Sequence, residues 1–161
     1  METPQRKPNR LAGFDYSNAG AYHIIICTSK RRSLFWENVG ATIGRLTDIR
    51  LSASGKIVDD VIREISEKYP AVTVDQYIIM PDHVHLLIQI HMDTNGMRQK
   101  TPSIDRIIQQ MKGVVTKKIG FPIWQKGYYD HVVRCDADYL ETWEYIAGNP
   151  GRWLEKQQNQ T

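Results

Sequence analysis

The sequence predicts an α+β fold built on one four-stranded antiparallel sheet, with helices on one face of the sheet. Two observations lead to this prediction. First, short stretches rich in β-branched residues indicate strands, and stretches whose apolar residues recur at helical spacing indicate helices. Second, these stretches follow one another in the order strand, helix, strand, strand, helix, strand. This is the β-α-β-β-α-β order of the ferredoxin-like sheet. One more helix is expected at the C-terminal end, and it carries Tyr145.

The composition indicates a single globular domain. The chain has 161 residues, of which 41% are hydrophobic and 24% are charged, with a net charge of +3. A chain of this length buries enough surface to fold without disulfides. We expect a basic arm over residues 1–19, one domain over residues 20–153 and a polar tail over residues 154–161.

Apolar runs and cysteines bear on the location of the protein. The longest apolar run covers residues 24–27, so no membrane span is expected. The N-terminal segment is polar and basic, which is not typical of a signal peptide. The two cysteines, Cys27 and Cys135, are too few for a disulfide framework or a thiolate zinc site, so a reducing, cytoplasmic compartment is predicted.

The first half of the chain is expected to contain three strands and one helix. Residues 21–28 are short and β-branched, which favours a buried strand, and residues 34–51 are ambiguous and fit a hairpin. Strands are predicted over residues 72–79 and 83–91, on either side of a turn at Met80-Pro81-Asp82, because proline cannot continue a central ladder. After the first strand a helix is predicted to begin at Ser54 and to end at Pro70, and its apolar positions recur at helical spacing: Ile57, Val58, Val61, Ile62 and Ile65.

A second helix and a short strand follow. The helix is predicted over residues 103–119, with Ser103 as its N-cap, because Gly120 and Pro122 stop it. Its apolar stripe consists of Ile104, Ile107, Ile108, Met111, Val114 and Val115. The short strand is expected near residues 129–134.

The last helix is predicted to be capped by Asp136 and to end at Asn149-Pro150. With residues placed about 100° apart, one apolar arc forms the expected core face, made of Tyr139, Leu140, Trp143, Ile146 and Ala147. Tyr145 lies on the polar side, and Asn149 lies one turn later on the same side. A phenol in that position can be a nucleophile, a hydrogen-bonding group or an incidental surface residue.

Two histidines open the strand predicted over residues 83–91. Side chains alternate across a strand, so His83 and His85 share one face while the other face is purely apolar. Two imidazoles at this spacing can hold one divalent ion, and Asp82 or Gln89 can orient the rings. The pattern also fits solvent-facing strand histidines that bind no ligand.

The donor set favours a hard divalent cation over zinc. Zinc usually takes three or four protein ligands, and no cysteine lies near the histidine pair. Two histidines and one oxygen ligand leave positions for phosphate oxygens, which suits Mg²⁺ or Mn²⁺. Tyrosine has a pKa of about 10 and is a poor nucleophile unless such an ion polarises a neighbouring phosphodiester.

Basic residues gather in two segments of a chain whose total charge is small. Residues 1–32 carry six basic and two acidic side chains, and residues 98–118 carry six basic and one acidic side chain. If folding brings these segments together, they form a phosphate-binding face, although solubilising surface charge also explains each of them. The residues predicted to hold DNA phosphates are Arg6, Lys7, Arg10, Arg31, Arg32, Lys112, Lys117 and Lys118.

The histidine strand, the polar-face tyrosine and the basic clusters occur together with longer motifs. These are Met-Pro-Asp-His-Val-His at residues 80–85, Trp-Gln-Lys-Gly-Tyr-Tyr-Asp-His-Val-Val-Arg at residues 124–134 and Glu-Tyr-Ile-Ala-Gly-Asn-Pro at residues 144–150. In this combination and order, the chain resembles the HUH single-tyrosine transposases of small insertion sequences, and most closely their REP-associated relatives. The resemblance extends over residues 10–153.

The resemblance implies a ferredoxin-like fold and metal-dependent cleavage and rejoining of single-stranded DNA beside a hairpin. It places the metal-binding pair at His83 and His85 and the nucleophile at Tyr145, through a 5′-phosphotyrosine intermediate. A polar residue one turn after the nucleophile, often glutamine, completes the metal site in relatives, and here that position holds the shorter Asn149. Mg²⁺ or Mn²⁺ is the implied cofactor. No nucleotide is expected, because the chain has no Gly-x-x-x-x-Gly-Lys loop.

Other residues and other functions compete with these assignments. Tyr128, Tyr129 and His131 are rival catalytic candidates, and we interpret the two tyrosines as packing or DNA-contacting residues. His23 and His91 are expected to be surface or sheet residues. The alternative functions are a domesticated protein that binds DNA hairpins at chromosomal repeats without catalysis, and a small metal-dependent hydrolase. No membrane partner is expected, and both a monomer and a homodimer are compatible with the sequence.

Overall fold

The four predicted strands pair into one antiparallel sheet. The computed structural model describes residue 16 and residues 18–37, 49–92 and 102–159. Within these residues lie β1 (Gly20–Cys27), β2 (Val72–Ile79), β3 (His83–Ile90) and β4 (Tyr129–Val133), in the order β2-β3-β1-β4, with antiparallel neighbours throughout. This is the ferredoxin-like arrangement expected from the order of the elements, so the α+β prediction is confirmed.

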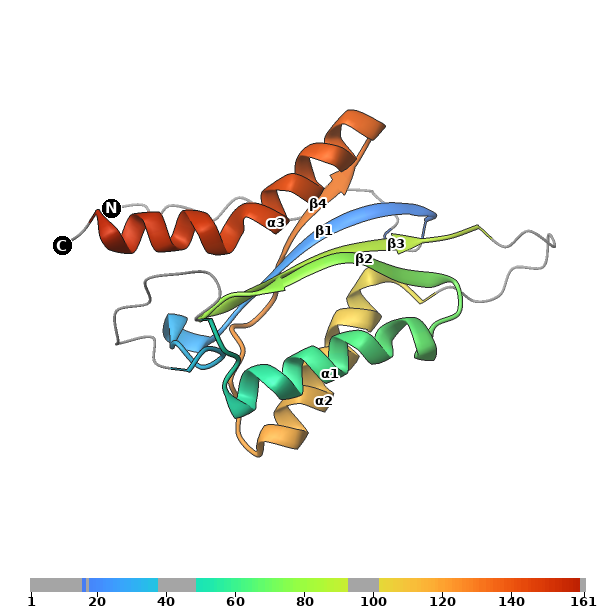
Figure 1. Cartoon of the computed structure of the whole chain (residues 1–161). Coiled ribbons are helices and arrows are strands. Elements are labelled where there is room, and N and C mark those ends of the chain that lie inside the picture. Colours follow the sequence, from blue (N-terminus) through green and yellow to red (C-terminus); the bar gives the residue numbers. More distant parts are fainter. Residues whose placement is uncertain (1–15, 17, 38–48, 93–101, 160–161) are drawn as a thin grey trace, which may run out of the picture.

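Helices lie on both faces of this sheet. α1 (Ala53–Lys68) and α2 (Ile104–Ile119) lie together on one face, as predicted, and α3 (Asp136–Gln158) lies on the other (Figure 1). A 3₁₀ turn, η1 (Ser29–Arg31), follows β1. No helix in the described part of the chain is long and apolar enough to cross a membrane.

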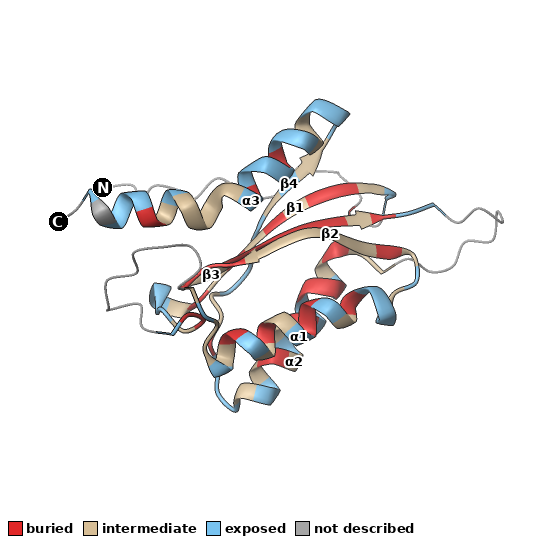
Figure 2. Ribbon diagram, viewed as in Figure 1, coloured by how far each residue is buried: buried red, intermediate tan, exposed pale blue. Residues whose placement is uncertain are grey.

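The main core lies between the sheet and the pair α1 and α2. Alternate side chains of β3 lie in this core, and all of them are buried: Val84, Leu86, Ile88 and Ile90. Figure 2 shows the buried residues of α1 and α2 along the sides that face the sheet. A second, smaller apolar cluster consists of Ala21, Leu87 and Ile146, and it joins α3 to the opposite face. That face therefore has room for polar side chains.

Local capping signals determine where α1 and α2 begin. The Ser103 hydroxyl accepts a hydrogen bond from the Arg106 amide at 3.3 Å, as expected for the N-cap of α2. α1 begins one residue earlier than predicted because its cap is Ser52, whose hydroxyl accepts from the Gly55 amide at 3.1 Å. α2 ends as predicted at Gly120, whose φ of 99° lies in the left-handed region.

α3 is longer than predicted. It continues through Pro150 to Gln158, so the predicted end at residues 149–150 is wrong, and its N-cap is Cys135 rather than Asp136. Pro150 has no N–H to donate to the carbonyl one turn earlier. The helix accordingly bends between its orange and red parts (Figure 1).

Packing beyond the bend explains why α3 continues. The rings of Trp153 and Trp36 meet edge to face with their centroids 5.0 Å apart, and Leu154 is buried. Such contacts outweigh the cost of an internal proline, which is about 3 kcal/mol. The polar tail predicted from residue 154 therefore begins inside α3.

The buried side of α3 differs from the predicted core arc. Leu140 and Trp143, which belong to that arc, are 57% and 37% exposed, whereas Thr142 and Ile146 are buried. The surface beneath α3 is the histidine-bearing face of the sheet, so the helix turns a largely polar side inward. Part of its apolar arc is left in solvent as a result.

Two predicted segments lie partly outside the described residues. In the predicted arm, Tyr16 is described and buried, and its carbonyl accepts from the Ile104 amide at 3.1 Å, so this residue belongs to the core. The ends of the ambiguous segment pair through an antiparallel bridge between Trp36 and Leu51, which fits the predicted hairpin. Residues 38–48 of that segment lie outside the described residues.

Candidate active site

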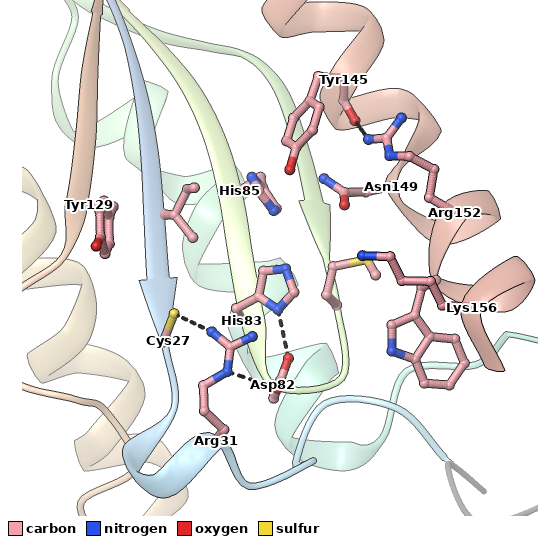
Figure 3. Close-up of a pocket in the computed structure, with 13 residues that line it drawn as sticks. Cys27, Arg31, Asp82, His83, His85, Tyr129, Tyr145, Asn149, Arg152 and Lys156 are labelled. Carbon is pink, nitrogen blue, oxygen red and sulfur yellow. Dashed lines mark hydrogen bonds and ion pairs between the residues drawn. The ribbon is translucent and has the colours of Figure 1, made fainter. Parts of the chain in front are cut away.

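A pocket of about 480 Å³ opens between the sheet and α3 (Figure 3). Its walls come from β1 and η1, from the start of β3 with the turn before it, from β4 and from one side of α3. The residues that line it are Ile25, Cys27, Arg31, Met80, Asp82, His83, His85, Tyr129, Tyr145, Asn149, Arg152, Trp153 and Lys156. Distant parts of the sequence thus bring histidines, tyrosines, an amide and cationic side chains to one space.

β3 presents its two histidines to this pocket. His83 and His85 alternate with the buried Val84 and Leu86, as the strand pattern predicted. The two imidazole rings meet edge to face with their centroids 4.9 Å apart. His85 is only 3% exposed. The interpretation of the pair as solvent-facing histidines therefore does not hold for His85.

Asp82 holds His83 in place. Its Oδ1 accepts a hydrogen bond from His83 Nδ1 at 2.6 Å, and its Oδ2 accepts one from Arg31 Nε at 3.0 Å. Burial raises the pKa of Asp82, but the bond from His83 and the guanidinium of Arg31 outweigh it and hold the pKa below its usual range. Because an ionised carboxylate can only accept, His83 donates from Nδ1, and Nε2 is the ring nitrogen that remains available to a cation.

The backbone of η1 turns Arg31 toward the pocket. Lys30 and Arg31 have φ values of 55° and 54°, in the left-handed region that residues other than glycine seldom occupy. From this turn the Arg31 guanidinium reaches both Asp82 and the Sγ atom of Cys27, the latter at 2.8 Å. Strained backbone of this kind persists where surrounding contacts fix it, and it is often found at functional sites.

His85 is buried against a third histidine. Its Nδ1 lies 3.0 Å from Nε2 of His23 in β1, and the two rings stack with their centroids 5.2 Å apart. Burial is the main cause that lowers the pKa of His85 to about 3 and the pKa of His23 to about 4. Both rings are therefore neutral at pH 7.

His23 is a sheet residue, as expected, and from β1 it also contacts His85 and Tyr145. One signal could have identified it. In the ferredoxin-like order the first strand lies beside the third, so alternate residues of the first strand share the face of the histidine pair. His23 lies on that face because Tyr22 and Ile24, on either side of it, are buried in the main core.

Tyr145 reaches the histidines from α3. The centroid of its ring lies 5.7 Å from that of His85 and 6.1 Å from that of His23, in edge-on contacts. Figure 3 shows the ring pointing into the pocket from the helix. The residue is 48% exposed, so it is accessible to a large substrate.

Asn149 lies one turn after Tyr145, on the side of α3 that faces His85 (Figure 3). Its Nδ2 atom is buried without a hydrogen-bond partner among the described residues. Rotating the amide by half a turn would place Oδ1 in that position, because the two atoms are distinguished only by their partners. An unpartnered buried polar atom costs about 1–3 kcal/mol, and a cation beside the histidines would relieve that cost for the oxygen.

Arg152 and Lys156 continue the same side of α3. Together with Tyr145 and Asn149 they occupy positions i, i+4, i+7 and i+11 of one helix face. The Arg152 guanidinium folds back, donates to the carbonyl of Tyr145 and lies 4.4 Å from the centroid of its ring. Neither residue is among the predicted phosphate contacts, because the helix was predicted to end before them, at residues 149–150. The signal that identifies them is their helical spacing from Tyr145 and Asn149.

The donor atoms of the pocket suit a divalent cation. In the described part of the chain, no three or more His, Cys, Asp or Glu side chains form a group that could hold a metal. An ion would therefore depend on His83, His85 and an oxygen such as that of Asn149. Two imidazoles and one amide oxygen leave open positions that phosphate oxygens can fill, which fits Mg²⁺ or Mn²⁺.

The position of Cys27 contradicts the expectation that no cysteine lies near the histidine pair. This residue pairs in register with His83 across β1 and β3 and lines the pocket, so a cysteine does lie near the histidines. Its Sγ atom accepts from the Arg31 guanidinium. Among the described side chains Cys27 forms no metal-binding group with the histidines, so the preference for a hard ion now rests on geometry.

The predicted DNA-binding residues do not gather at one place. Arg31 lines the pocket, whereas Arg32 donates to the Ser29 and Pro122 carbonyls at 3.4 Å. Lys112 donates to the carbonyls of Gln125 and Gly127 at 2.8 and 2.9 Å, and burial lowers its pKa, so we assign it a structural role. Lys117 and Lys118 end α2, across the sheet from the pocket, and Arg6, Lys7 and Arg10 lie outside the described residues.

The rival catalytic candidates have other contacts. Tyr128 donates to Asp105 Oδ1 at 2.7 Å and packs against the main core. His131 lies opposite His23 across β1 and β4 and bonds Asp138 through Nε2 at 2.9–3.0 Å. Tyr129 is 59% exposed and lines the pocket. Of these residues, only Tyr129 shares the pocket with the histidine pair.

The chain is similar in sequence to known proteins. Residues 16–149 match the family model described as "Transposase IS200 like". An uncharacterized protein of Haemophilus influenzae is 30% identical over 171 aligned residues, which cover 94% of this chain and 92% of the relative. A putative REP-associated tyrosine transposase of the same organism is 31% identical over 96 residues, which cover 55% of this chain and 54% of the relative.

One solved structure shares the fold. It is described as a REP-associated tyrosine transposase bound to a REP hairpin, and it matches with a TM-score of 0.59 and 16% sequence identity. The match covers 94% of this chain and 74% of the other. At this identity the likeness concerns the fold alone, and it agrees with the order of strands and helices described above.

Proposed function

Because the chain belongs to the IS200-like transposase family, we propose that it cleaves and rejoins single-stranded DNA beside a hairpin through a covalent 5′-phosphotyrosine on Tyr145. The observation that carries this proposal is the convergence of Tyr145 with His83 and His85 in one pocket. The centroids of the Tyr145 and His85 rings lie 5.7 Å apart, although the two residues belong to elements far apart in sequence.

The proposed substrate has a duplex stem and an unpaired flank. The solved structure that shares this fold is described as bound to a REP hairpin, and we extend that substrate class to this chain. A stem supplies shape and phosphates, while an unpaired flank can enter a pocket and stack on aromatic rings. Tyr129, exposed at the rim of the pocket, offers such a ring.

Three cationic side chains surround the proposed place of the phosphate. Arg31 lies on one side of His83, and Arg152 and Lys156 lie on the α3 side (Figure 3). A phosphodiester between them exchanges water for charged hydrogen bonds, and arginine can make two of these at once. The cations therefore hold and orient the strand beside Tyr145.

His83, His85 and Asn149 would hold the divalent cation, which we propose to be Mg²⁺ or Mn²⁺. When bound, the ion would polarise the phosphate and offset the negative charge that develops on it. Asp82 orients the His83 ring through the bond to Nδ1 and so keeps Nε2 directed away from that bond.

Tyr145 supplies the proposed nucleophile. Its hydroxyl gives a proton to solvent and its oxygen forms a bond to phosphorus, while the bond between phosphorus and the 3′ oxygen breaks and that oxygen takes up a proton. One DNA fragment leaves with a 3′-hydroxyl, and the other stays linked to Tyr145 through its 5′ phosphate. Attack by a second 3′-hydroxyl reverses the step and rejoins DNA. The covalent link conserves the phosphodiester energy, so no nucleotide needs to be hydrolysed.

A labelled oligonucleotide with a hairpin and unpaired flanks tests this proposal on the full chain. Wild type and the control Tyr129→Phe should form an adduct with Mn²⁺ that survives a denaturing gel. Tyr145→Phe should bind the hairpin and form no adduct, and a chelator should abolish the adduct of wild type.

Other outcomes separate the alternatives. An adduct in Tyr145→Phe would refute the assignment of the nucleophile. Hairpin binding by wild type without any adduct or cleavage would favour a protein that binds chromosomal repeats without catalysis. Cleavage without a covalent intermediate would favour a metal-dependent hydrolase.

A further inference from the structure

His23 does not line the pocket, yet it contacts two residues that do. Its Nε2 lies 3.0 Å from Nδ1 of His85, and its ring meets the ring of Tyr145 with the centroids 6.1 Å apart. β1 is a central strand, and its register places His23 between Leu87 of β3 and His131 of β4. Hydrogen-bonded strands on both sides therefore fix the backbone from which this ring projects.

The position of one proton decides what His85 can bind. The hydrogen bond between His23 Nε2 and His85 Nδ1 contains a single proton, because one of the two ring nitrogens must donate and the other must accept. If His23 donates, the proton of His85 lies on Nε2, which then has no lone pair for a cation. If His85 donates from Nδ1, its Nε2 is free to bind one.

We propose that His23 is a positioning residue that accepts the hydrogen bond from Nδ1 of His85 and so fixes the tautomer whose Nε2 binds the divalent cation. This inference rests on the proposed function, which requires a cation at His85. Its nearest parallel in the pocket is Asp82, which accepts the hydrogen bond from Nδ1 of His83.

The choice of acceptor follows from burial. His83 is 14% exposed in its side chain and its partner Asp82 is 22% exposed, so a carboxylate can remain ionised there. His85 is more deeply buried, and an ionised carboxylate beneath it would carry a large desolvation cost. A neutral imidazole accepts the same bond without a buried charge.

Two substitutions separate the hydrogen bond from packing. His23→Leu keeps an apolar side chain in place but removes the acceptor, and His23→Gln keeps an acceptor. His91, an exposed histidine just beyond β3, provides the control variant His91→Leu. We expect the dissociation constant of Mn²⁺, measured by electron paramagnetic resonance, to rise 10–100-fold in His23→Leu. It should stay close to the wild-type value in His23→Gln and His91→Leu.

Long-range ¹H–¹⁵N spectra of the metal-free full chain identify the tautomer directly. We expect the proton of His85 on Nδ1 in wild type and in His23→Gln. A proton on Nε2 of His85 in wild type, or unchanged Mn²⁺ affinity in a folded His23→Leu, would overturn the inference. If His23→Leu does not fold, the wild-type tautomer and the affinity of His23→Gln decide it. Wild type that has the expected tautomer but binds no Mn²⁺ would support the role of His23 and contradict the proposed metal site instead.

Discussion

Each histidine of the pocket has one ring nitrogen occupied by a neighbour. Asp82 engages Nδ1 of His83, and His23 engages Nδ1 of His85. A free imidazole on a strand can rotate, whereas these two rings are held with their centroids 4.9 Å apart. This organisation of the partners, more than the His-x-His spacing, makes the pair suited to bind a cation.

Buried histidines make the stability of the fold depend on pH. A histidine in an unfolded chain has a pKa of about 6.5, but the pKa is about 4 for His23 and about 3 for His85 in the folded chain. Below pH 6.5 the unfolded chain therefore binds more protons, and the free energy of unfolding falls as the pH is lowered toward 4. The contribution of the two buried histidines to the free energy of unfolding is fully retained above pH 6.5.

Urea unfolding at pH 7.5 and pH 5 measures this effect. We expect wild type to lose about 2 kcal/mol per buried histidine between these conditions. The loss should be about 2 kcal/mol smaller in His23→Gln. A loss of equal size in the two proteins would contradict the buried, neutral state of His23.

Among the elements, α3 brings the proposed nucleophile to the sheet through a small contact. Ile146 packs against Ala21 and Leu87, and Tyr139 donates to Asp75 Oδ2 at 2.7 Å. Burial, followed by the bond to Asp75, raises the pKa of Tyr139 to about 12, so the phenol stays a donor. These contacts fix α3 on the sheet and leave the space beside His85 open as a pocket.

Gly148 makes room for Arg152 above Tyr145. A Cβ atom at Gly148 would lie 2.7 Å from Nη1 of Arg152, whereas one at Gly151 would meet nothing within 4 Å apart from its chain neighbours. Alanine is favoured over glycine inside a helix by about 1 kcal/mol, so neither Gly148→Ala nor Gly151→Ala should destabilise the fold. Only Gly148→Ala should displace the guanidinium and lower the rate of adduct formation to that of Arg152→Ala.

Thermal unfolding and gel assays of the adduct measure the two effects separately. Gly151→Ala is the matched control, because it adds the same methyl group to the same helix at a position where a Cβ atom meets nothing within 4 Å apart from its chain neighbours. Equal adduct rates in the two alanine variants would contradict the proposed role of Arg152.

Local patterns in the sequence were sufficient for most elements. The alternation in β3 and the apolar stripes of α1 and α2 depend on side chains close in sequence, and their buried faces were predictable for that reason. The continuation of α3 beyond Pro150 was not predictable from local patterns. The cost of this proline is offset by the contact of Trp153 with Trp36, which lies far away in sequence. The proposed role of His23 likewise depends on which strands become neighbours in the sheet.

Across the whole molecule, the sheet separates a packing face from a face that carries the pocket. α1 and α2 cover the main core on one side, and the pocket opens beneath α3 on the other (Figures 1 and 2). The basic residues at the end of α2, Lys117 and Lys118, lie on the packing side. The small total charge therefore says little about where DNA binds, because the pocket has its own cations.

The salt dependence of DNA binding should reflect this separation. Each phosphate of a single strand that a protein neutralises contributes about 0.7 to the slope of log affinity against log salt. The double variant Arg152→Ala, Lys156→Ala should reduce the slope by about 1.4. Lys117→Ala, Lys118→Ala should leave it unchanged, as measured by fluorescence anisotropy. A reduced slope in the α2 variant would place the strand on the packing face.

The most direct test of the proposed mechanism is to identify the residue to which DNA becomes covalently linked. The full chain is allowed to react with the hairpin oligonucleotide and Mn²⁺, and mass spectrometry with peptide fragmentation locates the added mass. The mechanism predicts the mass of one 5′-phosphorylated DNA fragment on Tyr145. The same mass on Tyr128 or Tyr129, or cleaved DNA with no mass added to the protein, would contradict it.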